Sequence, residues 1–468
     1  MALTEREKGA HLLRRFGLGA SESELNYYMQ DGLKGAINKL LNCESTPEAY
    51  DFKWEVVENA KDAIKPAQAV VGLAARMMMT RRPLVEKMTL FWHNHFATSA
   101  EKVTNAPLMI QQNEIFRRNA LGNFKTLLLE VSKDPAMLIW LDGQDNIKGR
   151  ANENFAREVM ELFTLGVGNY TEKDVQEAAR AFTGWSFVRT AKGRAEKAPA
   201  QYMFKPVLHD NGAKTFLGRS GNLTGEEVIG ILCANPQLAA FVTTKIWNWF
   251  VYPNPEPSVI KPFAEDFIRS GLDIKTLIRA IVESNEFYSE RSYRKLIKNP
   301  IDFCLSTTRA MGIGESMAEK LAAAGAGESA AKAKIGPAAG VSGAMKNQGM
   351  WLLYPPDVSG WKPGEAWITS ATMVERISWA NKLMGITTKG GVGKYPIYSL
   401  LADDPTPQGI AKKLASMYDA PFTQVKLDTL AKAASQSLKG EVLSQKNANA
   451  VAADVLRLIF GSPEFQFC

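Results

Sequence analysis

Four histidines are the residues of this chain with the clearest potential for chemistry: His11, His93, His95 and His209. Histidine changes its charge near neutral pH and is a common metal ligand, so it serves both acid-base catalysis and metal binding. In a large helical protein a histidine can equally be a buried residue whose hydrogen bonds are satisfied by its neighbours. We therefore keep a functional and a structural interpretation for each of the four.

Glu158 is the next candidate, because it falls within the clearest helical pattern of the sequence, residues 152–165. On a helical wheel it lies on the apolar face that includes Phe155 and Leu162. An unpaired buried carboxylate costs several kcal/mol, so Glu158 needs a metal ion, an arginine or its own proton. The candidate arginine partners are Arg157, Arg180 and the adjacent Arg14 and Arg15.

These residues support two hypotheses. In the first, Glu158 forms a buried ion pair that locks helices together and does no chemistry. In the second, His95, Glu158 and His209 are catalytic residues that converge across one cavity, where a carboxylate with a raised pKa would act as a general base. Nitrogen and oxygen ligands also suit a divalent transition metal such as zinc, iron or manganese, and the candidate ligands are His95, Glu158, Glu161 and His209.

The spacing of His93 and His95 argues against a shared metal ion. Pro83 marks a helix start, and the apolar residues Met88 and Phe91 continue the helical pattern into this pair. At about 100° per residue, the two imidazoles would point about 200° apart. His95 then joins the apolar face, and His93 becomes a candidate ligand only if the helix ends before it.

The charge pattern and the remaining motifs exclude several classes of protein. Lys and Arg number 56 against 49 Asp and Glu, and the net charge of +7 is spread along the chain without the basic runs of a nucleic-acid-binding arm. We therefore expect no nucleic-acid partner. The sequence has no P-loop, GxGxxG turn or GxSxG elbow, so nucleotide-binding and serine-hydrolase functions have no support. The four cysteines form no CxxC pair, which argues against a zinc knuckle or a redox motif.

Membrane and export signals are also missing from the pattern. No stretch approaches the roughly 18 consecutive apolar residues that a transmembrane helix needs. Residues 1–8 lead into an amphipathic helix without an apolar signal-peptide region. We therefore expect no membrane span and a cytoplasmic location.

Helical periodicity dominates the sequence, which predicts a mainly α fold: a multi-helix globular array with long loops and at most a small β-hairpin insertion. Residues 191–222 interrupt the pattern and predict a loop or hairpin. Residues 322–347, rich in Ala, Gly and Ser, predict a connector or an edge helix of little packing value. The predicted helical regions are 1–190, which carries the His and Glu motifs, 223–321, and 348–468, which we expect to pack on the same core.

A series of short motifs, several of which contain the histidines, runs through the chain in a fixed order. They are HLLRRFG at 11–17, FWHNHF at 91–96, NENFARE at 152–158, ELFTLG at 161–166, YTE at 170–172, AFTGW at 181–185, HD at 209–210 and PPDVSGW at 355–361. This order resembles that of the bacterial family catalogued as domain of unknown function 1800, from about Leu3 to Phe465.

The resemblance implies kinship and no established substrate, cofactor or catalytic residue. Genes of this family tend to lie beside those of a second uncharacterised family, domain of unknown function 1501, which implies a protein of that family as a partner. Many relatives look exported, unlike the present chain, and some carry a histidine where this chain has Phe163. Two functions follow as hypotheses: an enzyme with a buried His and carboxylate site, metal-dependent or not, or a non-catalytic assembly protein that binds a protein partner.

Overall fold

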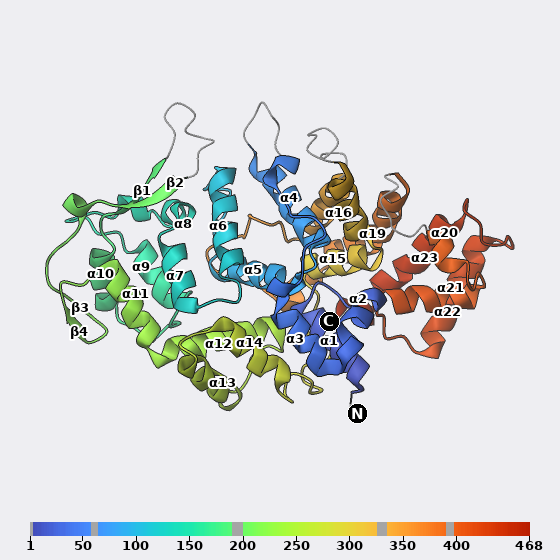
Figure 1. Cartoon of the computed structure of the whole chain (residues 1–468), viewed down its shortest axis with the longest axis horizontal. Helices are drawn as coiled ribbons and strands as arrows, with labels where there is room; N and C mark the ends of the chain where they lie inside the picture. Colours follow the sequence, from blue (N-terminus) through green and yellow to red (C-terminus); the bar gives the residue numbers. More distant parts are fainter. Residues whose placement is uncertain (1–2, 58–63, 190–199, 325–334, 390–396) are drawn as a thin grey trace.

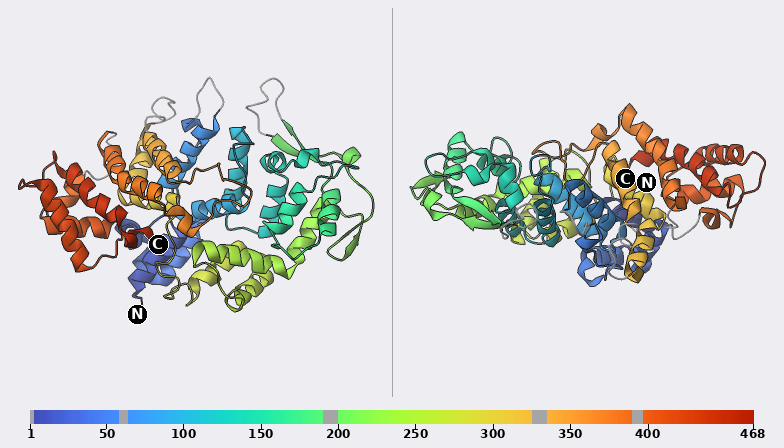
Figure 2. Two further views of the ribbon diagram at one scale, coloured as in Figure 1. Left: turned by 180° about the vertical axis from the view of Figure 1, so that it is seen from behind. Right: turned by 90° about the horizontal axis from the view of Figure 1, so that it is seen from above.

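The computed structural model describes residues 3–57, 64–189, 200–324, 335–389 and 397–468. Within these ranges the protein is mainly helical, as predicted, and its strands are confined to two small sheets. The molecule is elongated: the hairpins and α9–α11 lie at one end, and α20–α23 lie at the other (Figures 1 and 2). The first helices of the chain lie between these two ends.

The buried apolar side chains form two clusters, which we call the first core and the second core. The first core is built mainly from α1 (Glu5–Phe16), α3 (Gly32–Leu41), α5 (Pro83–His95), α7 (Phe124–Ser132), α9 (Asn154–Glu161), α10 (Glu172–Ala181), α11 (Gly225–Ala234), α12 (Pro236–Phe250), α13 (Pro257–Arg269) and α14 (Ile274–Glu283). Two shorter helices, α2 (Glu22–Tyr28) and α8 (Pro135–Trp140), pack beside them.

The second core joins helices that are far apart in the sequence. Its helices are α4 (Pro66–Met79), α15 (Pro300–Ala310), α16 (Ile313–Ala324), α18 (Gly336–Asn347), α19 (Ser370–Lys389), α20 (Ile397–Leu401), α21 (Pro407–Met417), α22 (Gln424–Leu438) and α23 (Ala448–Gly461). We call α19–α23 the C-terminal lobe. Three of the described helices contribute to both cores: α5, α6 (Ala106–Arg118) and α8.

Local sequence signals explain where many helices begin. Thr4, Thr171 and Thr224 each accept a hydrogen bond from the third residue of the following helix and complete a capping box with an acidic residue there. Proline, which lacks the backbone N–H that a first turn leaves unpaired, starts several others. These are α4, α5, α12, α13, α15 and α21.

Two hairpins occur around the predicted interruption: the second lies within residues 191–222, and the first begins before them, in the region predicted as helical. Strand β1 (Trp185–Arg189) pairs antiparallel with β2 (Ala200–Phe204), and β3 (Lys214–Phe216) pairs antiparallel with β4 (Arg219–Gly221). The tip of the first hairpin falls outside the described residues. The prediction of a small hairpin insertion in a mainly helical protein is therefore confirmed, with two hairpins in place of one.

The described part of the predicted connector is a packed helix. Residues 336–347 form α18, which buries Ala338, Val341, Ala344 and Met345 against α4, α15 and α19. The small side chains that suggested a connector let neighbouring helices approach closely instead. Residues 325–334 of that predicted segment lie outside the described residues. The division of the chain into five regions stays a prediction.

Among the described helices, none is by itself long and apolar enough to cross a membrane. The pair α11 and α12 passes the same test of length and composition only when both helices are joined across a 75° bend.

Candidate functional site

His95 is the last residue of α5, and it is buried in the first core. The helix continues through both histidines of the FWHNHF motif, so His93 and His95 point in different directions, as the helical wheel predicts. The condition under which His93 would join a metal site with His95, a helix that ends before it, is not met.

The imidazole of His95 donates through Nε2 to the carbonyl of Phe163 at 3.1 Å. This carbonyl is open to a side chain because α9 ends at Glu161. The chain turns after that point, and the amides of Leu165 and Gly166 both bond to the carbonyl of Met160. The predicted helix over 152–165 is therefore shorter than its apolar pattern suggests, and its early end gives His95 a backbone partner.

Aromatic rings surround His95 on several sides, including those of Phe91, Phe96 and Phe163. Burial is the main reason why the pKa of His95 is lowered to about 3; the nearby ammonium group of Lys245 acts in the same direction, and the hydrogen bond to Phe163 acts against it. His95 is therefore neutral at physiological pH. Its Nδ1 atom is buried and has no hydrogen-bond partner among the residues that the structure describes.

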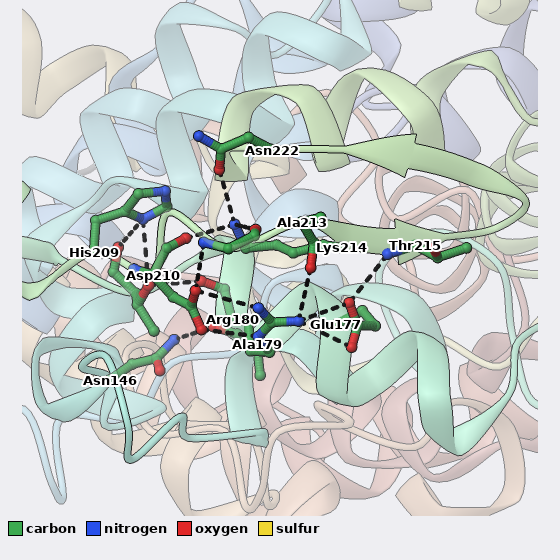
Figure 3. A network of polar contacts seen from close by, with 12 residues as sticks. Asn146, Glu177, Ala179, Arg180, His209, Asp210, Ala213, Lys214, Thr215 and Asn222 are labelled. Atoms are coloured by element: carbon green, nitrogen blue, oxygen red, sulfur yellow. Dashed lines mark hydrogen bonds and ion pairs between the residues drawn. The ribbon is translucent and has the colours of Figure 1, made fainter.

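His209 is also buried, in the middle of the loop that leads from β2 to β3. Its Nδ1 atom donates to the carbonyl of Thr183 at 2.9 Å. At this point the loop folds back over α10 (Figure 3). Its Nε2 atom is buried and, in the described part of the chain, has no hydrogen-bond partner. Like His95, His209 uses one ring nitrogen to hold a backbone carbonyl.

A charged network next to His209 fastens the same loop to α10 (Figure 3). Arg180 donates to both carboxylate oxygens of Asp210, at 2.8 and 3.2 Å, and also contacts Glu177. The buried Lys214 donates to the carbonyls of Asp210 and Gly212. Arg180 also lowers the pKa of Asp210 to about 2, so this carboxylate stays charged. This network holds the loop in place, so it explains the position of His209 without a catalytic or metal-binding role.

Glu158 is half-buried on α9, and burial raises the pKa of its carboxyl group. Neighbouring Glu161 raises this pKa further, and Arg157 lowers it. The carboxylate of Glu158 forms no hydrogen bond or ion pair in the described part of the chain. Glu161 accepts a hydrogen bond from Tyr170 at 2.7 Å.

The prediction that an arginine pairs with Glu158 is wrong, because each candidate arginine has other partners. Arg157 binds Glu153 and Glu172, and Arg180 binds Glu177 and Asp210. Arg14 binds Asp419 in the C-terminal lobe, and Arg15 donates to the carbonyls of Phe250, Val251 and Ser292.

The structure does not bring the candidate ligands together. Among the described residues, no group of three or more His, Cys, Asp or Glu side chains is arranged to hold a metal ion. The set His95, Glu158, Glu161 and His209 is included in that statement. None of the three candidate catalytic residues, His95, Glu158 and His209, lines the cavities described below.

The remaining two histidines also form hydrogen bonds to backbone atoms, and their partners lie still farther away in the sequence. Buried His11 donates through Nε2 to the carbonyl of Phe287 at 2.9 Å. Buried His93 accepts from the amide of Leu353 at 3.1 Å. Burial lowers the pKa of His11 well below its usual value and that of His93 to about 4. All four histidines therefore connect a helix or loop to the backbone of another segment.

A cavity of about 500 Å³ lies between α4, α5, α6, α14 and the segment that follows α3. Its lining is rich in charged side chains of both signs, and none of them was a candidate from the sequence. These residues come from five separate stretches of chain, so no spacing within any one stretch indicates the cavity.

A protein-family comparison agrees with the resemblance of the motifs. Residues 11–467 match the family model described as a protein of unknown function, DUF1800. No curated protein and no solved structure matches the chain. Because the family model covers nearly the whole chain, this protein belongs to the DUF1800 family.

Proposed function

We propose that this protein is a non-catalytic helical assembly protein, in which the four histidines hold the fold together and the surface binds a protein partner. The observation that carries the proposal is the common role of the histidines. His11, His93, His95 and His209 are all buried, and each bonds to a backbone atom of another segment. A residue used in this way supports a scaffold whether or not any reaction takes place on it.

The C-terminal lobe offers a surface for such a partner. Two neighbouring cavities of about 440 and 450 Å³ share Gly461 and Pro463 in their linings, and we call them together the lobe groove. Leu458 on α23 lines it with 44% of its surface exposed. Open apolar grooves are typical of protein-binding surfaces. The other apolar side chains of the lining are Ile297, Ile368, Met373, Ile377, Phe422, Leu430 and Phe467.

The partner we propose for the lobe groove is a protein of the domain of unknown function 1501 family, whose genes lie beside those of this family. The lobe groove has three charged residues in its lining, Glu365, Lys426 and Arg457, and the two basic ones form ion pairs with neighbouring acids. Lys426 pairs with Glu464, and Arg457 pairs with Asp454. A groove of this kind favours an apolar face of the partner over a charged one.

The test is a binding titration of the purified chain with a purified protein of that second family. Leu458→Asp places a charge in the lobe groove and should weaken the complex by about tenfold or more. Val442→Asp is the matched control, since Val442 is 84% exposed and does not line the groove. The proposal fails if no complex forms, or if both variants bind as tightly as the unchanged protein.

An enzyme remains the second candidate function, and one specific observation favours it. Glu158 has a raised pKa and no partner among the described residues, and buried ring nitrogens of His95 and His209 lack partners. A carboxyl group with a raised pKa can act as a general acid or base.

Metal analysis of the purified protein separates the two functions. A transition metal bound at close to one ion per chain, and lost in both Glu158→Gln and His209→Ala, supports a metal-dependent enzyme. If these substitutions leave the metal content unchanged, the candidate ligands do not bind a metal ion. That result favours the assembly function.

A further inference from the structure

The charged cavity of about 500 Å³ belongs neither to the histidine sites nor to the lobe groove. Its volume lies within the range of cavities that bind small molecules. Three helices that meet near the middle of the molecule, α4, α5 and α6, form much of its wall (Figure 1). The cavity is therefore framed by helices that also build the two cores.

The lining contains five basic and four acidic side chains. The basic residues are Arg76, Arg82, Arg117, Arg118 and Lys275, and the acidic residues are Glu44, Glu48, Asp51 and Glu86. Most of these charges already have partners, so the partner of each one decides what the cavity can bind.

Four of the five cations are held by carboxylates. Arg117 pairs with the buried Glu86 and lies 3.5 Å from Glu114, which also pairs with Arg76. The last two pairs lie nearer the surface, Arg118 with Glu130 and Lys275 with Glu44.

Arg82 is the exception among these cations. Its Nε atom donates to the carbonyl of Thr46 at 2.7 Å, and this bond fixes the direction of the side chain. Within the described part of the chain, its two terminal nitrogens have no hydrogen bond, and no carboxylate forms an ion pair with it. Arginine presents these two nitrogens as a planar pair that matches a carboxylate or a phosphate.

The remaining carboxylates of the lining either accept hydrogen bonds from other groups or are exposed. Glu48 accepts from the hydroxyl of Thr80 at 2.6 Å and from the amide of Arg81 at 2.7 Å. Asp51 is exposed and forms no ion pair in the described part of the chain. Arg82 is therefore the cation of the lining that has no carboxylate partner within the described part of the chain.

We infer that this cavity binds a small anion through a carboxylate or phosphate group, with the guanidinium group of Arg82 as the anchor. Arg76 supports the same ligand from α4, where its guanidinium lies 5.2 Å from the ring centre of Phe52. Its pairing with Glu114 leaves further N–H groups of Arg76 for the anion. This inference is independent of the assembly function, which uses the other side of the second core.

The test uses isothermal titration of the full chain with citrate and, separately, with inorganic phosphate. Saturable binding of one anion, with the other weaker, identifies which of the two groups the cavity prefers. Arg82→Gln should weaken that binding by about tenfold or more, because a charge-assisted pair is lost.

Arg81→Gln is the matched control, since it removes the same charge one residue away. Arg81 is exposed, and its side chain does not line the cavity. This substitution should change the affinity by less than about twofold. The inference is overturned if neither anion binds saturably, or if the two substitutions have equal effects.

A second measurement needs no variant and so does not depend on folding. Phenylglyoxal modifies accessible arginines, and mass spectrometry locates the modified residues. The preferred anion should protect Arg82 and leave the modification of Arg81 unchanged. Equal protection of both residues, or protection of neither, contradicts a site at Arg82.

Discussion

The first core and the C-terminal lobe are both helical, yet they are held together by different interactions. In the first core, buried histidines on α1 and α5 bond to backbone atoms of other segments. The lobe contains no histidine, and its helices pack through small and branched apolar side chains such as Ala434, Ala452 and Leu456. The first core therefore depends on hydrogen bonds from neutral polar groups, and the C-terminal lobe depends on the close packing of apolar side chains.

The junction between these two regions is charged. Asp419, just after α21, accepts from Arg14 on α1 at 2.6 Å and from Arg294 at 2.8 Å. A second tie is Arg376 of α19, which is fully buried and donates to the carbonyl of Lys298 and to Gln466. A mainly helical protein can thus be stabilised in three different ways: by histidine hydrogen bonds, by apolar packing and by ion pairs. Each of these can be tested by a different substitution.

The largest effect is expected at the junction, from Asp419→Ala. The substitution leaves two guanidinium groups without their carboxylate, and the side chains of Arg14 and Arg294 are only 3% and 13% exposed. The free energy of unfolding should fall by about 3–5 kcal/mol. Urea denaturation followed by circular dichroism measures this loss.

The control for this change is Asp266→Ala, which removes an exposed ion pair with Arg269 within α13. It should cost about 0.5 kcal/mol or less. Equal losses for the two variants would mean that the junction is not where the lobe is fastened.

A smaller effect is expected at His95, where two substitutions separate the hydrogen bond from the shape. His95→Leu leaves the carbonyl of Phe163 without its donor and should lower the free energy of unfolding by about 1–3 kcal/mol. His95→Gln can donate from the position of Nε2 and should cost less. If leucine were tolerated better than glutamine, packing and not the hydrogen bond would explain this histidine.

The dependence of stability on pH should distinguish the two regions further. The pKa values of His93 and His95 in the folded protein, about 4 and about 3, lie below the ordinary value of 6.5. Below about pH 6.5 the unfolded chain therefore takes up protons that the folded chain does not, so these two residues reduce stability as the pH falls from 6.5 toward 4. Denaturation curves over this range should show a flatter dependence for His95→Gln than for the unchanged protein.

Asp134 is expected to act in the opposite direction, which gives an internal check. Burial raises its pKa from 3.8 to about 7, so the folded chain holds this proton more tightly than the unfolded chain. Its contribution therefore lowers stability as the pH rises from 4 to 7. Asp134→Asn should remove that contribution and make stability rise more steeply with pH. Parallel curves for both variants would contradict the assignment.

The smallest effect is expected from Glu158→Gln. Because Glu158 has no partner among the described residues and a raised pKa, removing its charge should change the free energy of unfolding by about 0.5 kcal/mol or less. The same change at buried Glu86, which pairs with Arg117, should cost about 2–4 kcal/mol. A large loss at Glu158 would show that it stabilises the first core after all.

The sequence predicts the helical fold and the directions of side chains on α5 because both depend on local periodicity. The same reasoning is wrong for the partners of Glu158. The apolar pattern continues to Leu165, whereas α9 ends at Glu161, and Arg157 and Arg180 pair with other acids that a helical wheel cannot show. The charged cavity is beyond prediction for a related reason, since its lining is assembled only when α4, α5, α6 and α14 come together.

The bonds of the histidines to backbone atoms also bear on how this family can vary. Every residue has a carbonyl group and almost every residue has an amide, so positions 287, 353, 163 and 183 can change their side chains without breaking these four bonds. The histidines have no such freedom. An alignment of the family should then show fixed histidines with no position that changes together with them, a pattern easily mistaken for that of a catalytic site.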